Sequence, residues 1–160
     1  MSATKHEPIE IVMGDGSALA AVMEIMRDAF DPAYGEAWNT AQCAAILAGT
    51  GTWLLIAEQG GRPVGFALTR AIAGEAELLL IAVHPRVQGR GLGTALLRAV
   101  IDECHALFVE KLFLEVRACN NAIAFYINNG FRKVGERPSY YRGMDGKLFD
   151  AHSYSLQLKI

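Results

Sequence analysis

The stretch from Leu78 to Val100 constrains the fold more than any other, because a strand, a glycine-rich turn and a helix follow one another within it. Residues 78–83 form an unbroken apolar run, which is typical of a strand buried in a sheet, and Pro85 ends it. Beyond the turn, apolar residues recur at spacings of three and four, which predicts an amphipathic helix. These positions are Leu92, Leu96, Leu97, Val100, Ile101 and Cys104.

The loop between this strand and this helix contains three glycines, at positions 89, 91 and 93. Glycine has no Cβ atom, so a ligand can approach the backbone closely. The first amide groups of the following helix have no partner inside the helix, and the helix dipole is positive at that end, so both favour a bound phosphate. Arg90 adds a positive charge. The loop is therefore a candidate phosphate site, and a turn that merely reverses the chain is the alternative.

Two common phosphate-binding motifs do not match this loop. A P-loop requires a lysine after its last glycine, and none follows Gly93. The dinucleotide motif G-x-G-x-x-G has a different spacing and opens the first strand–helix unit of its domain, whereas this loop lies past the middle of the chain. The pattern that does fit is Gln-x-x-Gly-x-Gly at 88–93, after a strand that ends Ala-Val-His-Pro.

Length and charge restrict the functions to be considered. The 160 residues suit a single domain, 1–160, and a formal net charge of −2 argues against nucleic-acid binding. No apolar run is long enough to cross a membrane and the amino terminus has no apolar targeting segment, so we expect a cytoplasmic protein without a membrane partner. The three cysteines and four histidines are scattered, so we expect neither a disulfide framework nor a metal site.

The remaining segments predict an α/β fold. We expect strands at 9–13, 53–58, 63–69, 75–83, 111–117, from 131, and at 149–158. We expect helices at 18–29, 40–47, from 92 past 104, and at 120–129. Three successive strands joined by short turns form an antiparallel meander, and strand, helix, strand over 75–117 predicts a parallel pair with a crossover. The expected architecture is a single mixed, mostly antiparallel sheet with a central parallel strand pair, flanked by helices.

Three local expectations concern segments outside the central stretch. Thr40 is expected to cap the second helix. Residues 138–146 are expected to form a loop whose tyrosines, Tyr140 and Tyr141, either close over a substrate or pack as a hairpin. Residues 31–38 either cover a cleft or form a packed surface loop.

Glu115 interrupts an otherwise apolar strand, which we expect beside the strand that feeds the glycine loop. Carboxylates are rarely buried unless they are paired. Glu115 is therefore either a general base for an amine or a structural residue, paired with Arg117 or exposed at the strand end. Tyr126 lies on the next predicted helix, where a tyrosine on its own is more often a core anchor than a catalytic acid.

Taken together, these stretches resemble the GNAT superfamily of N-acetyltransferases. The pattern at 88–93 resembles its acetyl-CoA pyrophosphate loop, and Leu-Glu-Val-Arg at 114–117, followed by Asn120, Tyr126 and Gly130-Phe131, resembles its second signature. Within the superfamily the chain is most similar to the RimI type, which acetylates the N-terminal alanine of a small-subunit ribosomal protein. The residues that carry this similarity are 77–83, 88–97, 114–118, 130–131 and 137–141. It covers about residues 75–158.

This resemblance implies an enzyme that transfers an acetyl group from its co-substrate acetyl-CoA to a primary amine, without a metal. Glu115 matches the catalytic base, and Tyr126 matches the general acid that protonates the departing thiolate. The backbone of the strand end would pair with the pantetheine arm, and the loop would hold the pyrophosphate. The cofactor-binding positions so implied are Ile81, Ala82, Val83, Gln88, Gly89, Arg90, Gly91, Leu92, Gly93, Thr94 and Asn120.

The acceptor implied by the resemblance is the α-amine of a peptide or protein N-terminus, with a ribosomal protein among the candidates. Residues 30–43 are only loosely similar to the family pattern, and because this part of the fold shapes the acceptor site, other acceptors stay open. The segment between Glu115 and Tyr126 is one residue shorter than the pattern, which affects the match of Asn120 more than that of Tyr126. The alternatives are an acetyltransferase for a polyamine, an amino acid or an aminoglycoside, and a non-catalytic acyl-CoA-binding module. Acidic residues that we expect near the acceptor entrance are Glu36, Glu136 and Asp145. A monomer and a homodimer both fit the sequence.

Overall fold

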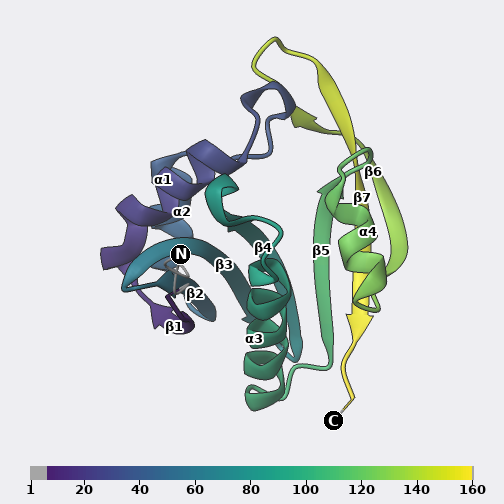
Figure 1. The fold of residues 1–160 in the computed structure, drawn as a ribbon. Helices are drawn as coiled ribbons and strands as arrows, with labels where there is room; N and C mark the ends of the chain where they lie inside the picture. The colour runs from purple at the N-terminus through teal and green to yellow at the C-terminus, as the bar shows by residue number, and fades with distance from the viewer. Residues whose placement is uncertain (1–6, 160) are drawn as a thin grey trace.

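The structure is a computed structural model that describes residues 7–159 (Figure 1). The segment 1–6, on which the expectation about targeting falls, lies outside the described residues. Seven strands form one sheet in the order β1-β2-β3-β4-β5-β7-β6. The strands are β1 (Ile9–Gly14), β2 (Thr52–Gln59), β3 (Arg62–Ile72), β4 (Glu75–Val83), β5 (Lys111–Arg117), β6 (Arg132–Arg142) and β7 (Leu148–Gln157). The α-helices are α1 (Leu19–Ala29), α2 (Thr40–Leu47), α3 (Leu92–Ala106) and α4 (Ala122–Asn128).

The sheet is antiparallel except at its centre, where β4 and β5 run parallel and α3 makes the crossover between them. The predicted meander is confirmed, because β2, β3 and β4 pair in sequence. The predicted strands 75–83 and 111–117 have the observed bounds of β4 and β5. The other elements agree with their predicted positions to within a few residues.

The parallel pair is short, and this creates a gap in the middle of the sheet. Glu75, Ala76 and Glu77 of β4 pair with Lys111, Leu112 and Phe113 of β5, and beyond them the two strands diverge (Figure 1). In β4, Leu80 lies opposite Leu68 of β3 and Leu78 lies opposite Thr69, so Leu79 is the extra residue of a β-bulge. A bulge bends its strand. From the bulge onward, the edge of β4 that faces β5 has no strand partner.

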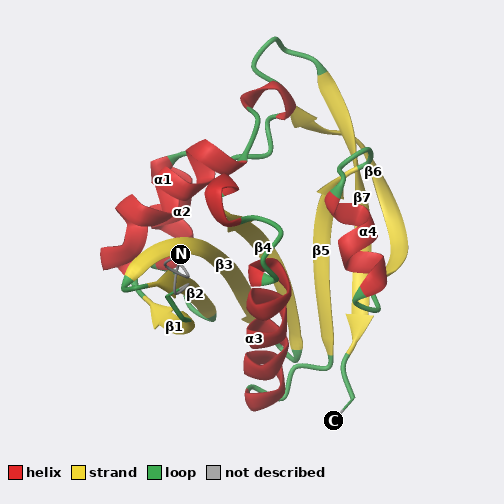
Figure 2. Cartoon of the chain, in the orientation of Figure 1, coloured by secondary structure: helices red, strands yellow, loops and turns green. Residues whose placement is uncertain are grey.

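Two hydrophobic clusters hold the sheet from opposite faces. In the first, α3 and α4 pack on one face, and Leu96, Leu97 and Val100 of α3 are completely buried. In the second, α1 and α2 pack on the other face of β2 to β4, around Phe66. Figure 2 shows α3 and α4 in front of the sheet. β4 is thus packed on both of its faces, whereas β5 packs against the first cluster alone.

Two local expectations are wrong. Asn39, rather than Thr40, caps α2, because its side chain accepts a bond from the Gln42 amide while the Gln42 side chain accepts one from the Asn39 amide, both at 2.8 Å. The segment 138–146 is not all loop, since β6 continues through Pro138 to Arg142. The pairing shifts register between Arg137 and Tyr141. β6 is an edge strand, where a proline removes no required hydrogen bond.

Candidate functional site

A cavity of about 500 Å³ occupies the gap between β4 and β5. Its lining comes from both strands, from the start of α4 and from the segment 29–36. Along this wall the N–H and C=O groups of β4 have no neighbouring strand as hydrogen-bond partner. An extended ligand that lies beside β4 could form these hydrogen bonds. The lining residues that the sequence predicted for a cofactor or for catalysis are Ile81, Ala82, Val83, Gln88, Glu115, Asn120 and Tyr126.

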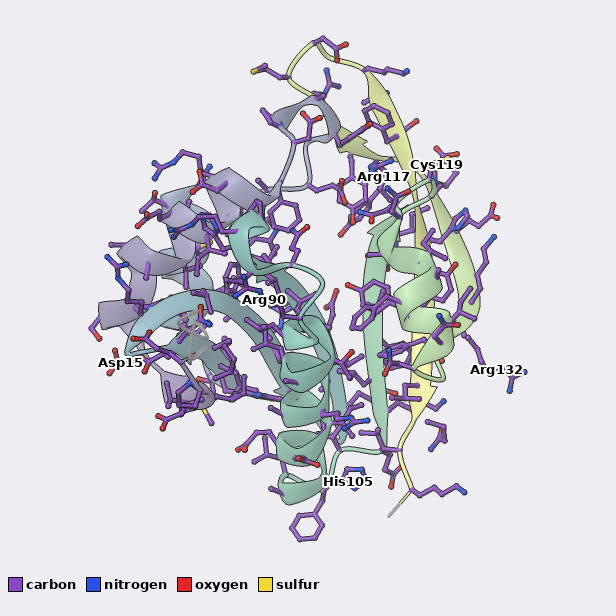
Figure 3. The ribbon with its side chains drawn as sticks, viewed as in Figure 1. Asp15, Arg90, His105, Arg117, Cys119 and Arg132 are labelled. Carbon is purple, nitrogen blue, oxygen red and sulfur yellow. The ribbon has the colours of Figure 1, made fainter. Side chains whose placement is uncertain are left out.

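The glycine loop leaves open space at the start of α3. Gly89 and Gly91 have left-handed φ angles of +78° and +80°, and a Cβ atom built on either would meet nothing within 4 Å. Arg90 lies between them, above α3 in Figure 3. A loop of this shape presents backbone N–H groups and the positive end of a 15-residue helix to the same space, so it fits a phosphate group.

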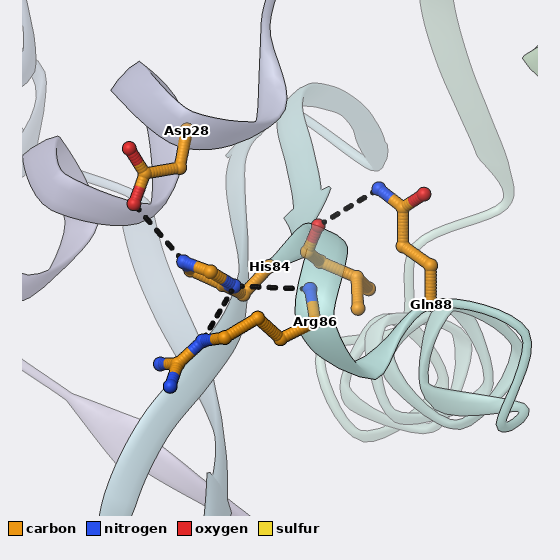
Figure 4. A network of polar contacts seen from close by, with 5 residues as sticks. Asp28, His84, Arg86 and Gln88 are labelled. Carbon is orange, nitrogen blue, oxygen red and sulfur yellow. Dashed lines mark hydrogen bonds and ion pairs between the residues drawn. The ribbon is translucent and has the colours of Figure 1, made fainter.

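Polar contacts anchor the strand end that leads into this loop (Figure 4). His84 Nε2 lies 3.0 Å from Asp28 Oδ2 of α1, and His84 Nδ1 accepts from the Arg86 backbone amide at 3.2 Å. Gln88 Nε2 donates to the Val83 carbonyl at 3.1 Å. A neutral His84 with its proton on Nε2 satisfies both ring contacts. These contacts tie the end of β4 to α1 on one side and to the loop on the other.

Glu115 projects from β5 and is held at both carboxylate oxygens. Oε1 lies 2.9 Å from Arg137 Nε, and Oε2 accepts a hydrogen bond of 2.7 Å from Ser153 Oγ. Its side chain is 15% exposed. The alternative of an ion pair with Arg117 is therefore wrong, because Arg117 binds another carboxylate. A part-buried carboxylate beside a cavity can accept a proton.

The partner of Arg117 is Glu36, which comes from the segment between α1 and α2. Arg117 Nε lies 2.9 Å from Glu36 Oε1, and both side chains are only 12% exposed. The Arg117 guanidinium lies 3.6 Å above the centre of the Tyr34 ring. Asn120 Nδ2 donates to Glu36 Oε2 at 2.7 Å. Figure 3 shows Arg117 at the end of β5 that faces this segment. The segment 31–38 therefore lies against the cavity and forms part of its wall.

Sequence reasoning placed Glu36 near the acceptor entrance, as an acidic residue that attracts a basic peptide. In the structure Glu36 lies in the cavity wall, where its carboxylate pairs with Arg117 and Asn120. The three residues are separated by 81 and 84 positions, so no local pattern shows that they meet. Arg137 and Ser153, the partners of Glu115, were missed for the same reason.

Tyr126 is almost fully buried on α4, with its ring edge-on to Phe131 at 5.7 Å. Burial, and secondly the charge of Glu36, raise the pKa of Tyr126 well above its usual range. Burial and then Glu36 likewise raise the pKa of Tyr141. Both hydroxyl groups therefore stay protonated at neutral pH. A protonated hydroxyl at the cavity wall is a proton donor.

A second cavity, of about 350 Å³, adjoins the first, and the two share Glu36, Leu78, Leu79, Glu115 and Tyr141. It is bounded further by Trp38 and by Tyr140, whose ring packs edge-on against Tyr141 at 4.9 Å. The predicted tyrosine pair thus lies beside the site, on a strand. Glu115 lies where the two cavities meet.

The structure also bears on metals and membranes within residues 7–159. In that range no group of three or more His, Cys, Asp or Glu side chains is arranged to hold a metal ion, and the three cysteines are free. No helix described there combines the length and the apolar character needed to span a membrane.

With this fold and site, the chain belongs to the acetyltransferase (GNAT) family, whose model matches residues 19–131. Among its relatives is the [ribosomal protein bS18]-alanine N-acetyltransferase of Escherichia coli K12, which is 46% identical over 90 residues, or 56% of this chain and 61% of the relative. The chain thus spans about three fifths of that relative's length. The N-alpha-acetyltransferase RimI of Mycobacterium tuberculosis is 39% identical over 110 residues, 66% of this chain and 68% of the relative.

Solved structures agree with this assignment. The crystal structure of the ribosomal-protein-S18-alanine N-acetyltransferase from Escherichia coli superposes with a TM-score of 0.85 at 34% identity, covering 96% of both chains. Ard1 from Thermoplasma volcanium superposes with a TM-score of 0.82 at 24% identity, covering 95% of this chain and 99% of its own, and shows the shared fold. The predicted family, GNAT, and the predicted fold class are confirmed.

Proposed function

We propose that this protein is an acetyl-CoA-dependent N-acetyltransferase that acts on the N-terminal α-amine of a peptide or protein. The observation that carries the proposal is the position of Glu115 at the junction of two cavities, one along the free edge of β4 and one lined by Trp38 and Tyr140. The first suits an extended thioester and the second its acceptor. Relatives that are named [ribosomal protein bS18]-alanine N-acetyltransferase support a ribosomal protein as the acceptor. The enzyme would then act in the cytoplasm.

Donor binding rests on the β4 edge and the glycine loop. The backbone of Ile81, Ala82 and Val83 would pair with the pantetheine arm, since that edge has no other strand beside it. The Asn120 side chain already donates to Glu36 and accepts from the Ala122 amide, so it would reach the donor through its remaining N–H. The residues proposed to hold the pyrophosphate are Gln88, Gly89, Arg90, Gly91, Leu92, Gly93 and Thr94.

Transfer requires that the ammonium of the acceptor loses a proton before it attacks. Glu115 would accept this proton, directly or through water, and the amine nitrogen would then form its bond to the thioester carbon. As the carbon–sulfur bond breaks, Tyr126 would donate its proton to the departing sulfur. The nitrogen of the new amide would release its second proton to solvent, and the tyrosinate would take one back from solvent. Tyr126 lines the first cavity and carries its proton at neutral pH, so it has a proton to give.

Proton energetics favour an α-amine over a lysine. An α-amine has a pKa of about 7.7 to 8.0 and a lysine of about 10.4, so deprotonation at pH 7 costs roughly 1 to 1.4 kcal/mol for the first and about 4.6 kcal/mol for the second. A single carboxylate base therefore suits an α-amine, whose deprotonation costs less free energy, better than a lysine.

The test is release of free thiol from acetyl-CoA with three acceptors: a peptide with a free N-terminal alanine, the same peptide N-blocked but carrying a lysine, and spermidine. We expect the highest kcat/KM with the free alanine peptide. A higher value for spermidine would indicate a small-amine enzyme. Tight CoA binding without thiol release from any acceptor would indicate a binding module.

A further inference from the structure

Two ion pairs separate the second cavity from a third one of about 570 Å³. The residues that line both of these cavities are Arg70, Glu77, Glu115 and Arg137. Arg70 Nη2 lies 3.6 Å from Glu77 Oε2, and Arg137 Nε lies 2.9 Å from Glu115 Oε1. The carboxylate that we propose as the base is therefore covered, on its acceptor side, by a cation of the protein itself.

The two partners of the Arg137–Glu115 pair differ in how firmly they are held. Glu115 is 15% exposed, lies in the central strand β5 and accepts a second bond from Ser153. The Arg137 side chain is 61% exposed, and it lies where the pairing of the edge strand β6 shifts register. An ion pair with one largely exposed partner contributes little to stability. Of the two, Arg137 is the residue that can move away.

Arg137 and Glu115 both line the second cavity, where the acceptor is proposed to bind. A base must lie within hydrogen-bond distance of the proton that it removes. Each carboxylate oxygen can accept two hydrogen bonds. Ser153 takes one position on Oε2 and Arg137 Nε takes one on Oε1, so an ammonium that approaches Oε1 from the second cavity meets the guanidinium. An arriving ammonium would replace the guanidinium without leaving the carboxylate unpaired. Displacement of Arg137 would also remove one of the two pairs between the second and third cavities.

We propose that Arg137 occupies the acceptor ammonium position on Glu115 and is displaced when a cationic acceptor binds. This proposal rests on the proposed function. It makes Arg137 a specificity-determining residue, because an acceptor without a positive charge offers Glu115 no replacement for the guanidinium. A compact ammonium and a planar guanidinium also differ in shape, so the exchange opens space beside the base.

The first test compares Arg137→Ala and Arg137→Gln with wild type on the alanine peptide. Loss of the competing cation should lower the acceptor KM about two- to fivefold, the range expected for a part-exposed ion pair, with little change in kcat. Arg132→Ala is the matched control, because Arg132 is an exposed arginine at the start of the same strand and projects away from the sheet (Figure 3). It should keep the wild-type KM.

The second test adds N-methylguanidinium, which mimics the arginine head group. It should inhibit Arg137→Ala competitively against the peptide and inhibit wild type and Arg132→Ala more weakly. An acceptor KM that rises or stays constant in both Arg137 variants, or no inhibition of Arg137→Ala, would overturn the proposal. Circular dichroism shows whether each variant is folded. If Arg137→Ala is unfolded, the result for Arg137→Gln decides the test. The wild-type rate reports on the proposed function, whereas the ratio of variant to wild type reports on Arg137.

Discussion

Replacement of Gly91 by glutamate tests the phosphate loop directly. Gly91 has a φ of +80°, and a Cβ atom at this position meets nothing within 4 Å, so the new side chain fits without a clash. Its effect on folding is therefore limited to the strain of a left-handed backbone in a residue other than glycine, about 1–2 kcal/mol. For a chain of this size that strain lowers the melting temperature by about 2–8 °C.

The effect on CoA binding should be much larger. A carboxylate placed about 5 Å from a phosphate charge, at an effective dielectric constant of about 20, gives a repulsion of about 3 kcal/mol per charge pair, or roughly a hundredfold in affinity. Isothermal titration calorimetry with CoA measures this loss. Gly91→Ala carries the same backbone strain without the charge, so it should keep most of the affinity.

Gly74→Glu is the matched control for strain and charge together. Gly74 has a φ of +84°, with nothing within 4 Å of a built Cβ atom, and it lies in the turn between β3 and β4. We expect a similar fall in melting temperature and an unchanged affinity for CoA. A folded Gly91→Glu variant with wild-type CoA affinity would refute the assignment of the loop.

Four further results are expected. Glu115→Gln should lower kcat by about a hundredfold to ten-thousandfold and leave CoA affinity unchanged, and wild-type turnover would exclude the base role. Tyr126→Phe should slow acetyl transfer while binding both substrates normally, as steady-state kinetics would show. The raised pKa of Tyr126 also predicts that stability falls above about pH 10, where the unfolded state ionises first, so Tyr126→Phe should flatten that fall in pH-dependent melting curves. Burial, followed by the charge of Glu103, raises the pKa of Cys104 to about 11, whereas Cys119 is exposed, so mass spectrometry should find iodoacetamide on Cys119 first.

The sequence by itself determined the elements whose signals are local. The run at 78–83, the glycines at 89 and 91 and the apolar spacing from Leu92 each depend on neighbouring residues, and the structure has β4, an open loop and α3 there. Backbone preferences and side-chain periodicity act over a few residues, so they are readable along the chain.

Only the tertiary structure decided which side chains meet in the site. Glu36 reaches Arg117 across 81 positions because the segment between α1 and α2 lies against the end of β5. Glu115 reaches Ser153 across 38 positions because β5 and β7 are neighbours in the sheet, where the two residues lie opposite each other. The position of β6 at the edge likewise explains why Pro138 does not end the strand. The gap that forms the main cavity depends on where β4 and β5 stop pairing, and the pairing of two strands that α3 separates along the chain cannot be read from either strand alone.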